Sequence, residues 1–376
     1  MQIATINASM LGIPFRLTFR HASAARSRTQ TLWVEARDAS GVVGYGESCP
    51  RDYVTAETIA GAEAYLARHT AHWCSAIHDY SSLKGWADEN RSGIDANPSG
   101  WAAVEMALLD LMGKLQGRSM DSLLGLPELA GTFRYSAVLG DATPRAFEAQ
   151  LAHYLKAGFD QFKIKLAGDF NRDAAKVTAL KAAGIAPRRV RADANNLWTD
   201  AATVVDYLRG LDYEFFALEE PLSPGNHAGM MQIAQALGCR IILDESLLRK
   251  EHLMPLYQAP AVWIGNLRIS KMGGLLRSLE LVGEARRLGL SLIVGAHVGE
   301  TSLLTRTALT AAHAAGNMLL AQEGAFGTHL LEHDVIDPPL MFKAGGLLEV
   351  ADWKFAGQPG LGLTLKVREF KRDIAP

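Results

Sequence analysis

Residues 189–220 read RVRADANNLWTDAATVVDYLRGLDYEFFALEE, and this stretch decides the fold. It opens with an apolar run at 189–194 and continues through 200–210, where apolar residues recur at helical spacing. It ends in a second apolar run at 214–219. An apolar run, an amphipathic helix and another apolar run indicate a strand–helix–strand unit with parallel strands.

The same pattern recurs on both sides of this stretch, from about residue 132 onward. Eight apolar runs alternate with helical segments such as 170–184, and they lie at 134–139, 161–166, 189–194, 214–219, 240–244, 261–267, 291–296 and 317–322. Eight βα repeats of about 25 residues are typical of a parallel (β/α)8 barrel, which usually takes ~250 residues. A doubly wound sheet is the alternative fold, but it rarely needs eight such even units.

The preceding part of the chain has a different pattern. Strand-like runs at 13–20, 31–37 and 42–47 come first. Two helical stretches follow, one at 54–70 with Thr55 as its cap and one at 98–117 that stops at Gly117. We therefore predict three parts: an α+β domain over 1–125, a barrel over 130–345, and a C-terminal segment over 346–376 that packs back on the first domain.

Composition excludes several classes of partner. The chain has 376 residues and a formal net charge of -2, so we expect no nucleic-acid or membrane partner. No run of about 18 residues is apolar throughout, and the first 20 residues lack the pattern of a signal peptide. The three cysteines are scattered and odd in number, which favours a reducing compartment. We expect a cytoplasmic protein.

Charged or polar residues end seven of the eight runs. Active sites of such barrels lie at the carboxyl ends of the strands, so these residues are candidates for one site. They are Lys163 and Lys165 on the second run, Asp193 and Asn195 on the third, Glu219 on the fourth, Asp244 and Glu245 on the fifth, Arg268 and Lys271 on the sixth, His297 on the seventh with Glu300 just after, and Glu323 on the eighth.

Three neighbouring runs supply Asp193, Glu219 and Asp244, which are 26 and 25 residues apart. Three carboxylates at one end of adjacent strands would repel one another unless a cation lay among them. Oxygen ligands without thiol or imidazole favour Mg²⁺ over Zn²⁺, with Mn²⁺ as a substitute. The sequence therefore predicts a Mg²⁺ site.

Lys163 and Lys165 are one residue apart, so on a strand they share a face. A second lysine and a metal ion nearby would lower a lysine's pKa and make it a general base near neutral pH. The proton next to a carboxylate is weakly acidic, and its loss puts a second negative charge on the carboxylate. A metal ion and fixed cations stabilise such an enolate-like species.

Taken in order, these residues resemble the enolase superfamily, and more closely the muconate lactonizing (muconate cycloisomerase) subgroup of the mandelate racemase–muconate lactonizing enzyme family. The resemblance rests on KIK at 163–165, DAN at 193–195, EEP at 219–221, DES at 244–246 and SKMGG at 270–274. AAVEMALLDLMGKLQG at 102–117 resembles the helix that links cap to barrel. The resemblance implies a modified (β/α)7β TIM barrel with an N-terminal α+β capping domain. For oligomeric state, a homo-oligomer is the usual expectation.

By this resemblance, Asp193, Glu219 and Asp244 correspond to the metal ligands. Lys165 matches the acid/base lysine, and Lys163 its partner that helps to bind the carboxylate. Asn195, Glu245, Lys271 and Glu323 are expected to contact substrate or to support the residues that do.

One position departs from the subgroup. Where it carries a second catalytic lysine, this chain has Arg268, which cannot deprotonate at useful pH. Arg268 would bind an anion or pair with Glu245. His297 resembles the base histidine of the mandelate racemase subgroup, and Glu300 or Glu323 would then orient it.

The predicted function is therefore a Mg²⁺-dependent isomerase or lyase that acts on a small carboxylate substrate by cycloisomerisation or dehydration. The alternative reaction is epimerisation of an amino-acid derivative or dipeptide, with Glu323 binding an ammonium group. The single acid in AQEGA departs from the paired aspartates of such epimerases. Alternatives of other classes are a Schiff-base aldolase with Lys165 as nucleophile and a non-catalytic metal-binding barrel.

Overall fold

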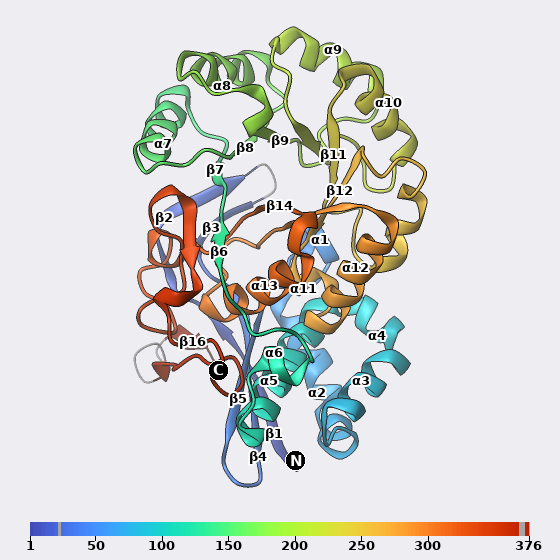
Figure 1. Cartoon of the computed structure of the whole chain (residues 1–376), viewed down its shortest axis with the longest axis vertical. Coiled ribbons are helices and arrows are strands. Elements are labelled where there is room, and N and C mark those ends of the chain that lie inside the picture. The colour runs from blue at the N-terminus through green and yellow to red at the C-terminus, as the bar shows by residue number, and fades with distance from the viewer. Residues whose placement is uncertain (22–23, 368–372, 376) are drawn as a thin grey trace.

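The computed structural model describes residues 1–21, 24–367 and 373–375. The larger part of the molecule is built around a curled sheet of eight parallel strands (Figure 1). An isolated bridge between Tyr135 and Gln322 joins the last strand to the chain that enters the first. The strands lie in chain order, and each falls within one of the eight predicted runs: β7 (Ala137–Leu139), β8 (Phe162–Lys165), β9 (Val190–Asp193), β10 (Ala217–Glu219), β11 (Arg240–Leu243), β12 (Trp263–Leu267), β13 (Ser291–Val294) and β14 (Leu319–Gln322).

The predicted barrel with an N-terminal cap is confirmed, and helices cover the outside of its sheet (Figure 1). α9 shows why they form: the Asp200 side chain caps its first turn by accepting the Thr203 N–H, and Val204 and Leu208 lie on its buried face. The covering helices are α7 (Pro144–Lys156), α8 (Phe170–Ala182), α9 (Ala201–Leu211), α10 (His227–Leu237), α12 (Leu275–Leu288) and α13 (Ser302–Ala315).

One unit departs from this alternation. Between β11 and β12 the chain forms a 3-10 helix, Lys250–Leu256, in place of an α-helix. Pro255 lies inside it, and proline lacks the N–H that an α-helix needs. The short helix α11 (Ile269–Met272) follows β12 directly.

The N-terminal unit is an antiparallel sheet of β1 (Ile3–Leu11), β4 (Thr31–Asp38) and β5 (Val43–Ser48), packed against helices. The hairpin of β2 (Pro14–His21) and β3 (Ala24–Arg28) leaves this sheet, and Phe15 bridges to Leu331 beyond β14. The helices of the unit are α1 (Asp52–Thr55), α2 (Ile59–Ala76), α3 (Tyr80–Glu89), α4 (Arg91–Ala96), α5 (Pro98–Gln116) and α6 (Met120–Leu123).

The prediction of Thr55 as a helix cap is wrong. α1 ends at Thr55, Ala56 turns into the left-handed region at φ 58°, and Thr58 caps α2 by accepting the Gly61 N–H. The Thr55 hydroxyl instead donates to Glu57, 2.8 Å away. That carboxylate accepts the N–H of Ser99 at the start of α5, so Thr55 serves the cap of a different helix.

Two strands near the end of the chain pair with earlier segments, and the second of them returns to the N-terminal unit. β15 (Leu347–Glu349) pairs with β6 (Thr132–Arg134), and β16 (Ile374–Ala375) pairs with β1, each in the antiparallel sense. Residues 368–372 and 376 of the predicted C-terminal segment lie outside the described residues. The domain boundaries at 125, 130 and 345 stay predictions.

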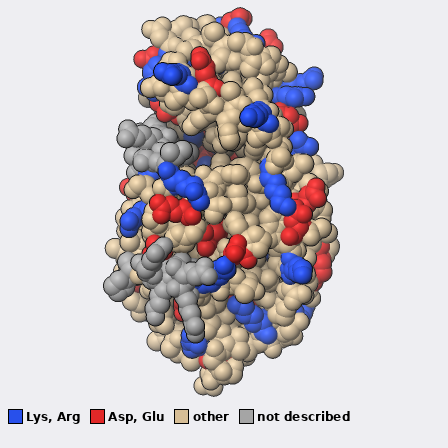
Figure 2. All heavy atoms as spheres, turned by 90° about the vertical axis from the view of Figure 1, so that its left-hand side faces the viewer, with Lys and Arg blue, Asp and Glu red and all other residues tan. Residues whose placement is uncertain are grey.

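Charged side chains of both signs lie on the molecular surface. Figure 2 shows basic and acidic side chains interspersed on the face that it presents. Among the described residues, we find no helix that combines the length and apolar character needed to span a membrane.

The contact of β5 with α5 yields a stability prediction. A Cβ on Gly46 would lie 1.9 Å from the Ala103 carbonyl oxygen, so the helix backbone occupies the space that a side chain needs. We expect Gly46→Ala to lower the free energy of unfolding by about 3 kcal/mol. Gly85, in α3, is the control because a Cβ there meets nothing within 4 Å. Gly85→Ala should stabilise by roughly 0.5–1 kcal/mol, and equal urea midpoints for the two variants would contradict the argument.

Candidate active site

The carboxyl ends of β8 to β11 bring lysine and carboxylate side chains to one level of the barrel. Lys165 pairs in register with Asp193, and Asp193 pairs with Glu219. Asp244 directly follows β11. The three acids are at most 1% exposed, and they lie above an apolar layer inside the sheet that contains Ala217, Ile242, Ile264 and Ile293. Charge at this depth needs partners.

Lys163 is the central cation. Its Nζ lies 3.0 Å from Asp193 Oδ2, 2.7 Å from Glu219 Oε2 and 3.0 Å from Glu323 Oε2. Burial alone would lower the pKa of Lys163, but these carboxylates raise it above its ordinary value. The side chain is only 2% exposed. Lys163 is therefore a fixed positive charge and a poor base.

Lys165 lies at the edge of the same cluster. Its Nζ is 2.6 Å from Asp193 Oδ2 and donates to Asn195 Oδ1 at 2.9 Å. Asn195 has a left-handed backbone at φ 46°, and its N–H returns to Asp193 Oδ1, which fixes the loop. The Lys165 side chain is 13% exposed. Lys165 thus combines a defined position with access from the barrel mouth.

Arg268 takes a different partner from the one predicted. Its Nη2 lies 2.5 Å from Asp244 Oδ2 and 3.8 Å from Glu219 Oε1, so the predicted pair with Glu245 is wrong. Asp244 and Glu245 both follow the end of β11, in a bend and a turn, and Arg268 pairs with the first of them. Burial would lower the pKa of Arg268, but Asp244 and Glu219 raise it. Lys271 also binds Asp244, through Nζ to the carboxylate and, at 2.6 Å, to the carbonyl oxygen.

Glu323 is held by two internal cations. One carboxylate oxygen pairs with Lys163, and the other lies 3.1 Å from Arg191 Nη1. Arg191 also donates to Ser136 Oγ at 2.7 Å. Arg191 was not among the predicted site residues. Its place in the site could have been predicted, because Arg191 precedes Asp193 by two residues on the same strand and so shares its face.

The second glutamate of EEP was also missed as a functional residue. Glu220 is fully buried, and its Oε1 accepts the N–H groups of Asp244 and Ser246, each at 2.7 Å. Burial, followed by the charge of Glu245, raises the pKa of Glu220 to about 8. Glu220 therefore fixes the loop that carries Asp244. Glu245 has a buried oxygen for which the described residues offer no hydrogen-bond partner, and burial and Asp244 raise its pKa to about 7.

The donor set of Asp193, Glu219 and Asp244 fits a hard divalent cation. It offers only carboxylate oxygens, and they come from three adjacent strands. Burial, followed by the charge of Asp193, raises the pKa of Glu219 to about 7, so these acids repel one another. In the structure Lys163 lies between Asp193 and Glu219, and Arg268 between Glu219 and Asp244. A metal ion bound by the three acids would share their oxygens with these two cations.

His297 lies apart from this ion-pair network. Its side chain is 1% exposed, and neither ring nitrogen has a hydrogen-bond partner among the residues that the structure describes. Burial, followed by the charges of Arg268 and Arg51, lowers the pKa of His297 well below its ordinary value. Glu300 Oε1 accepts the His297 backbone N–H and stays 3.7 Å from Nδ1. Neither Glu300 nor Glu323 donates to or accepts from the ring among the described residues, and the orienting role of Glu300 stays a prediction.

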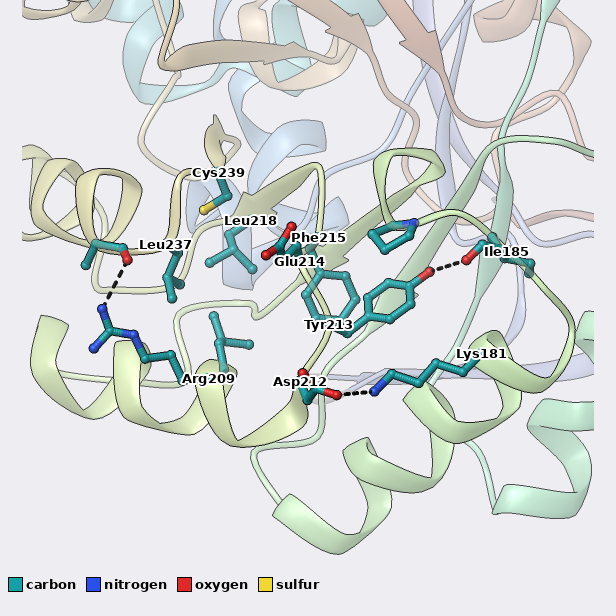
Figure 3. Close-up of a pocket in the computed structure, with 13 residues that line it drawn as sticks. Lys181, Ile185, Arg209, Asp212, Tyr213, Glu214, Phe215, Leu218, Leu237 and Cys239 are labelled. Carbon is teal, nitrogen blue, oxygen red and sulfur yellow. Dashed lines mark hydrogen bonds and ion pairs between the residues drawn. The ribbon is translucent and has the colours of Figure 1, made fainter.

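A separate cavity of about 660 Å³ opens at the other end of the barrel strands (Figure 3). Apart from Leu218 in β10, its lining residues precede β9, β10 and β11 or lie near the ends of the neighbouring helices, and they include Ile185, Tyr213 and Cys239. It contains none of the predicted site residues. Since barrel active sites lie at the carboxyl ends of strands, this cavity belongs to the opposite, stability-related face.

Comparison with known proteins matches both parts of the chain. A family profile described as enolase C-terminal domain-like matches residues 146–369. Another, described as mandelate racemase / muconate lactonizing enzyme, N-terminal domain, matches residues 5–125.

Individual relatives align over nearly the whole length. The L-Lys-D/L-Arg epimerase of Methylococcus capsulatus is 29% identical over 96% of this chain and 99% of its own. The dipeptide epimerase of Enterococcus faecalis, solved with Mg and the dipeptide L-Leu-L-Tyr, is 25% identical at a TM-score of 0.81, covering 97% of this chain and 100% of that one. The muconate lactonizing enzyme of Pseudomonas fluorescens, solved with muconolactone, shares the fold at 24% identity and a TM-score of 0.85, covering 99% of each chain.

Proposed function

Because the chain belongs to the mandelate racemase / muconate lactonizing enzyme family of the enolase superfamily, we propose that it is a Mg²⁺-dependent isomerase that removes the proton next to a substrate carboxylate. The observation that carries the proposal is the position of Lys165. It lies 2.6 Å from Asp193 at the mouth of the barrel, beside three buried carboxylates that suit a divalent cation.

The chain's own side chains account for the proton transfer. Neutral Lys165 takes the α-proton on Nζ, and the substrate becomes an enolate. Lys163 and Arg268 keep their positive charge and stabilise the charge that develops on the substrate carboxylate. Asp193, Glu219 and Asp244 would hold Mg²⁺, and the bound ion would supply Lewis-acid stabilisation of the enolate charge. Asn195 holds the Lys165 ammonium after transfer.

Epimerisation of an amino-acid derivative is the reaction that we propose first. It is supported by relatives named as epimerases that align with almost the whole chain. The proton must then return on the opposite face of the enolate. Arg268 cannot carry it. Lys271 is the lysine closest in sequence to Arg268, and it is buried beside Arg268 with its Nζ bound to Asp244. Burial lowers the pKa of Lys271, so this lysine is the second proton carrier that we propose.

A reaction on one face, cycloisomerisation or dehydration, is the second candidate. Arg268 favours it, because this cation is ion-paired and stays charged while Lys165 alone moves a proton. Glu323 affects which substrate fits the site, whichever of the two reactions takes place. Since Lys163 and Arg191 already neutralise its carboxylate, we expect an N-acylated substrate or a dicarboxylate to suit the site better than a free ammonium group.

The experiment is α-proton exchange in D₂O with Mg²⁺, over N-acyl amino acids, dipeptides and dicarboxylates. We expect exchange that requires Mg²⁺ and that proceeds with formation of the other epimer, deuterated at the α-carbon. Product without deuterium in recovered substrate would favour the second candidate. Tight Mg²⁺ binding without exchange on any acid would contradict the proposal. Lys181→Ala is the control variant, since this lysine is 45% exposed on α8.

A further inference from the structure

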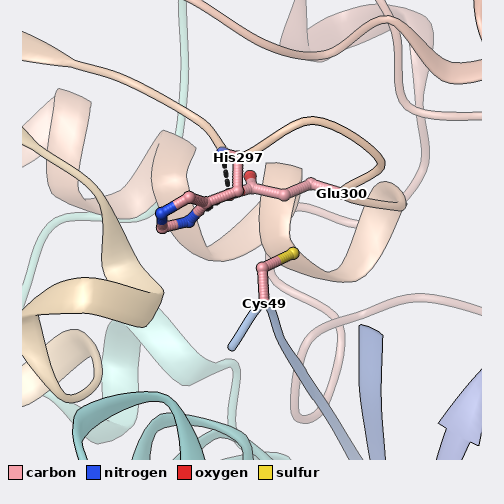
Figure 4. Close-up of side chains that lie close together, drawn as sticks. All are labelled: Cys49, His297 and Glu300. Carbon is pink, nitrogen blue, oxygen red and sulfur yellow. Dashed lines mark hydrogen bonds and ion pairs between the residues drawn. The ribbon is translucent and has the colours of Figure 1, made fainter. Parts of the chain in front are cut away.

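A second cluster of potential metal ligands lies where the N-terminal unit meets the barrel (Figure 4). Cys49 directly follows β5, and His297 and Glu300 lie in the loop between β13 and α13. One ligand atom from each of the three residues lies within 4.8 Å of the others. Among the described residues, no other group of three histidine, cysteine or acidic side chains brings its ligand atoms this close together.

His297 supplies an independent sign of a ligand. A buried polar group without a hydrogen bond costs ~1–3 kcal/mol, so native structures rarely leave one unpaired. The imidazole is 1% exposed, and neither ring nitrogen has a hydrogen-bond partner in residues 1–21, 24–367 and 373–375. Within the described part of the chain no carbonyl or carboxylate makes a hydrogen bond to the ring, and Glu300 Oε1 stays 3.7 Å from Nδ1. A bound ion would satisfy one of these nitrogens.

We propose that Cys49, His297 and Glu300 bind a transition-metal ion of the Zn²⁺ class, separately from the carboxylate site. A thiolate, an imidazole and a carboxylate are ligands that Zn²⁺ and Co²⁺ accept and that Mg²⁺ avoids. Bond lengths of about 2.0–2.3 Å put tetrahedral ligand atoms roughly 3.5 Å apart. The side chains would thus close inward by about 1 Å. On binding, the S–H bond of Cys49 breaks, a metal–sulfur bond forms, and the proton leaves to solvent.

The surroundings hold the three ligands in place. The Cys49 N–H donates to Ser270 Oγ at 3.1 Å, and the His297 N–H donates to Glu300. Gly299 adopts φ 95°, and a Cβ there would lie 3.0 Å from the Phe15 ring, so the barrel loop presses against the N-terminal unit. Supports of this kind orient ligands in metal sites.

The neighbouring charges are mixed. Arg51 faces the cluster, but its guanidinium donates to the carbonyl oxygens of Thr29, Gln30, Pro50 and Val298. Burial lowers the pKa of His297, and so do the positive charges of Arg268, Lys271 and Arg26. Burial raises the pKa of Cys49, and the negative charge of Glu47 adds to that increase. A thiolate and a carboxylate would cancel the charge of a divalent ion locally. The ion would tie the N-terminal unit to the barrel and leave His297 unavailable as a base.

Cobalt binding tests the proposal. Wild-type protein saturated with Mg²⁺ is titrated with Co²⁺, and thiolate-to-cobalt charge transfer is followed in the near ultraviolet. We expect the band in wild type and its complete loss in Cys49→Ser. The double variant Cys74→Ser/Cys239→Ser is the matched control and keeps the band, because these two thiols lie outside the cluster. No thiolate band in wild type, or an unchanged band in Cys49→Ser, would overturn the proposal.

Further measurements cover the case in which Cys49→Ser fails to fold. His297→Gln and Glu300→Gln should each weaken Co²⁺ binding by at least ~10-fold. X-ray absorption at the zinc edge of the wild-type protein needs no variant. A sulfur neighbour in the first coordination shell is expected, and a shell of oxygen atoms alone would refute the site. None of these readouts depends on the proposed reaction.

Discussion

Lys165→Ala is expected to slow α-proton exchange by about 10²–10⁴-fold while Mg²⁺ binding persists. Lys165 is the partly exposed lysine of the cluster at 13%, whereas Lys163 is only 2% exposed. Without Lys165 the α-proton has no acceptor at this position. Asp193 keeps its ion pair with Lys163, so the carboxylates stay in place. Exchange is measured by NMR in D₂O, and Mg²⁺ binding by the shift that it causes in the melting temperature.

The combination of readouts separates proton transfer from support of the metal site. If Lys165 only positioned Asp193, Lys165→Ala would weaken Mg²⁺ binding, and a high Mg²⁺ concentration would restore exchange. Restored exchange would therefore contradict the acid/base role. Lys181→Ala should match wild type in both measurements, because Lys181 pairs with exposed Asp212 on the surface.

The sequence was sufficient to predict the barrel and the level at which the charged residues gather. Each predicted run contains one strand, because a strand buried on both faces must be a short, nearly continuous apolar run. The ends of the runs then place Lys165, Asp193 and Glu219 side by side, as the register of β8, β9 and β10 requires. The residues at the ends of neighbouring runs therefore predict contacts between strands.

Contacts that depend on how side chains turn were not predictable. Arg268 reaches Asp244 rather than Glu245, and both acids adjoin the end of β11. Thr55 caps neither helix, because α1 ends there and α2 begins only at Ile59, where Thr58 is the cap. Cys49 and His297 are 248 positions apart (297 − 49), and no periodic pattern joins a strand end of the first unit to a barrel loop. Such meetings are set by the packing of one unit on the other.

Glu219→Gln is expected to weaken Mg²⁺ binding by at least about 100-fold and to abolish exchange at ordinary Mg²⁺ concentrations. The estimate exceeds the 10–100-fold that loss of a supporting partner costs in metal affinity, because Glu219 is a proposed ligand. The variant should still fold. Asn266 can donate to the new amide oxygen, and Lys163 keeps Asp193 and Glu323. Chelation of the wild-type protein should reproduce the loss.

Glu214→Gln, at an exposed position before β10, is the control and should bind Mg²⁺ as wild type does. In wild type a metal concentration of 100 times Kd stabilises the fold by about 2.7 kcal/mol, and this gain should vanish in Glu219→Gln. Together with Lys165→Ala, the variant distinguishes two chemistries. Activity that survives chelation and Glu219→Gln but not Lys165→Ala would mean that the lysine acts as a nucleophile. Borohydride would then trap a Schiff base, and the enolate mechanism would be refuted.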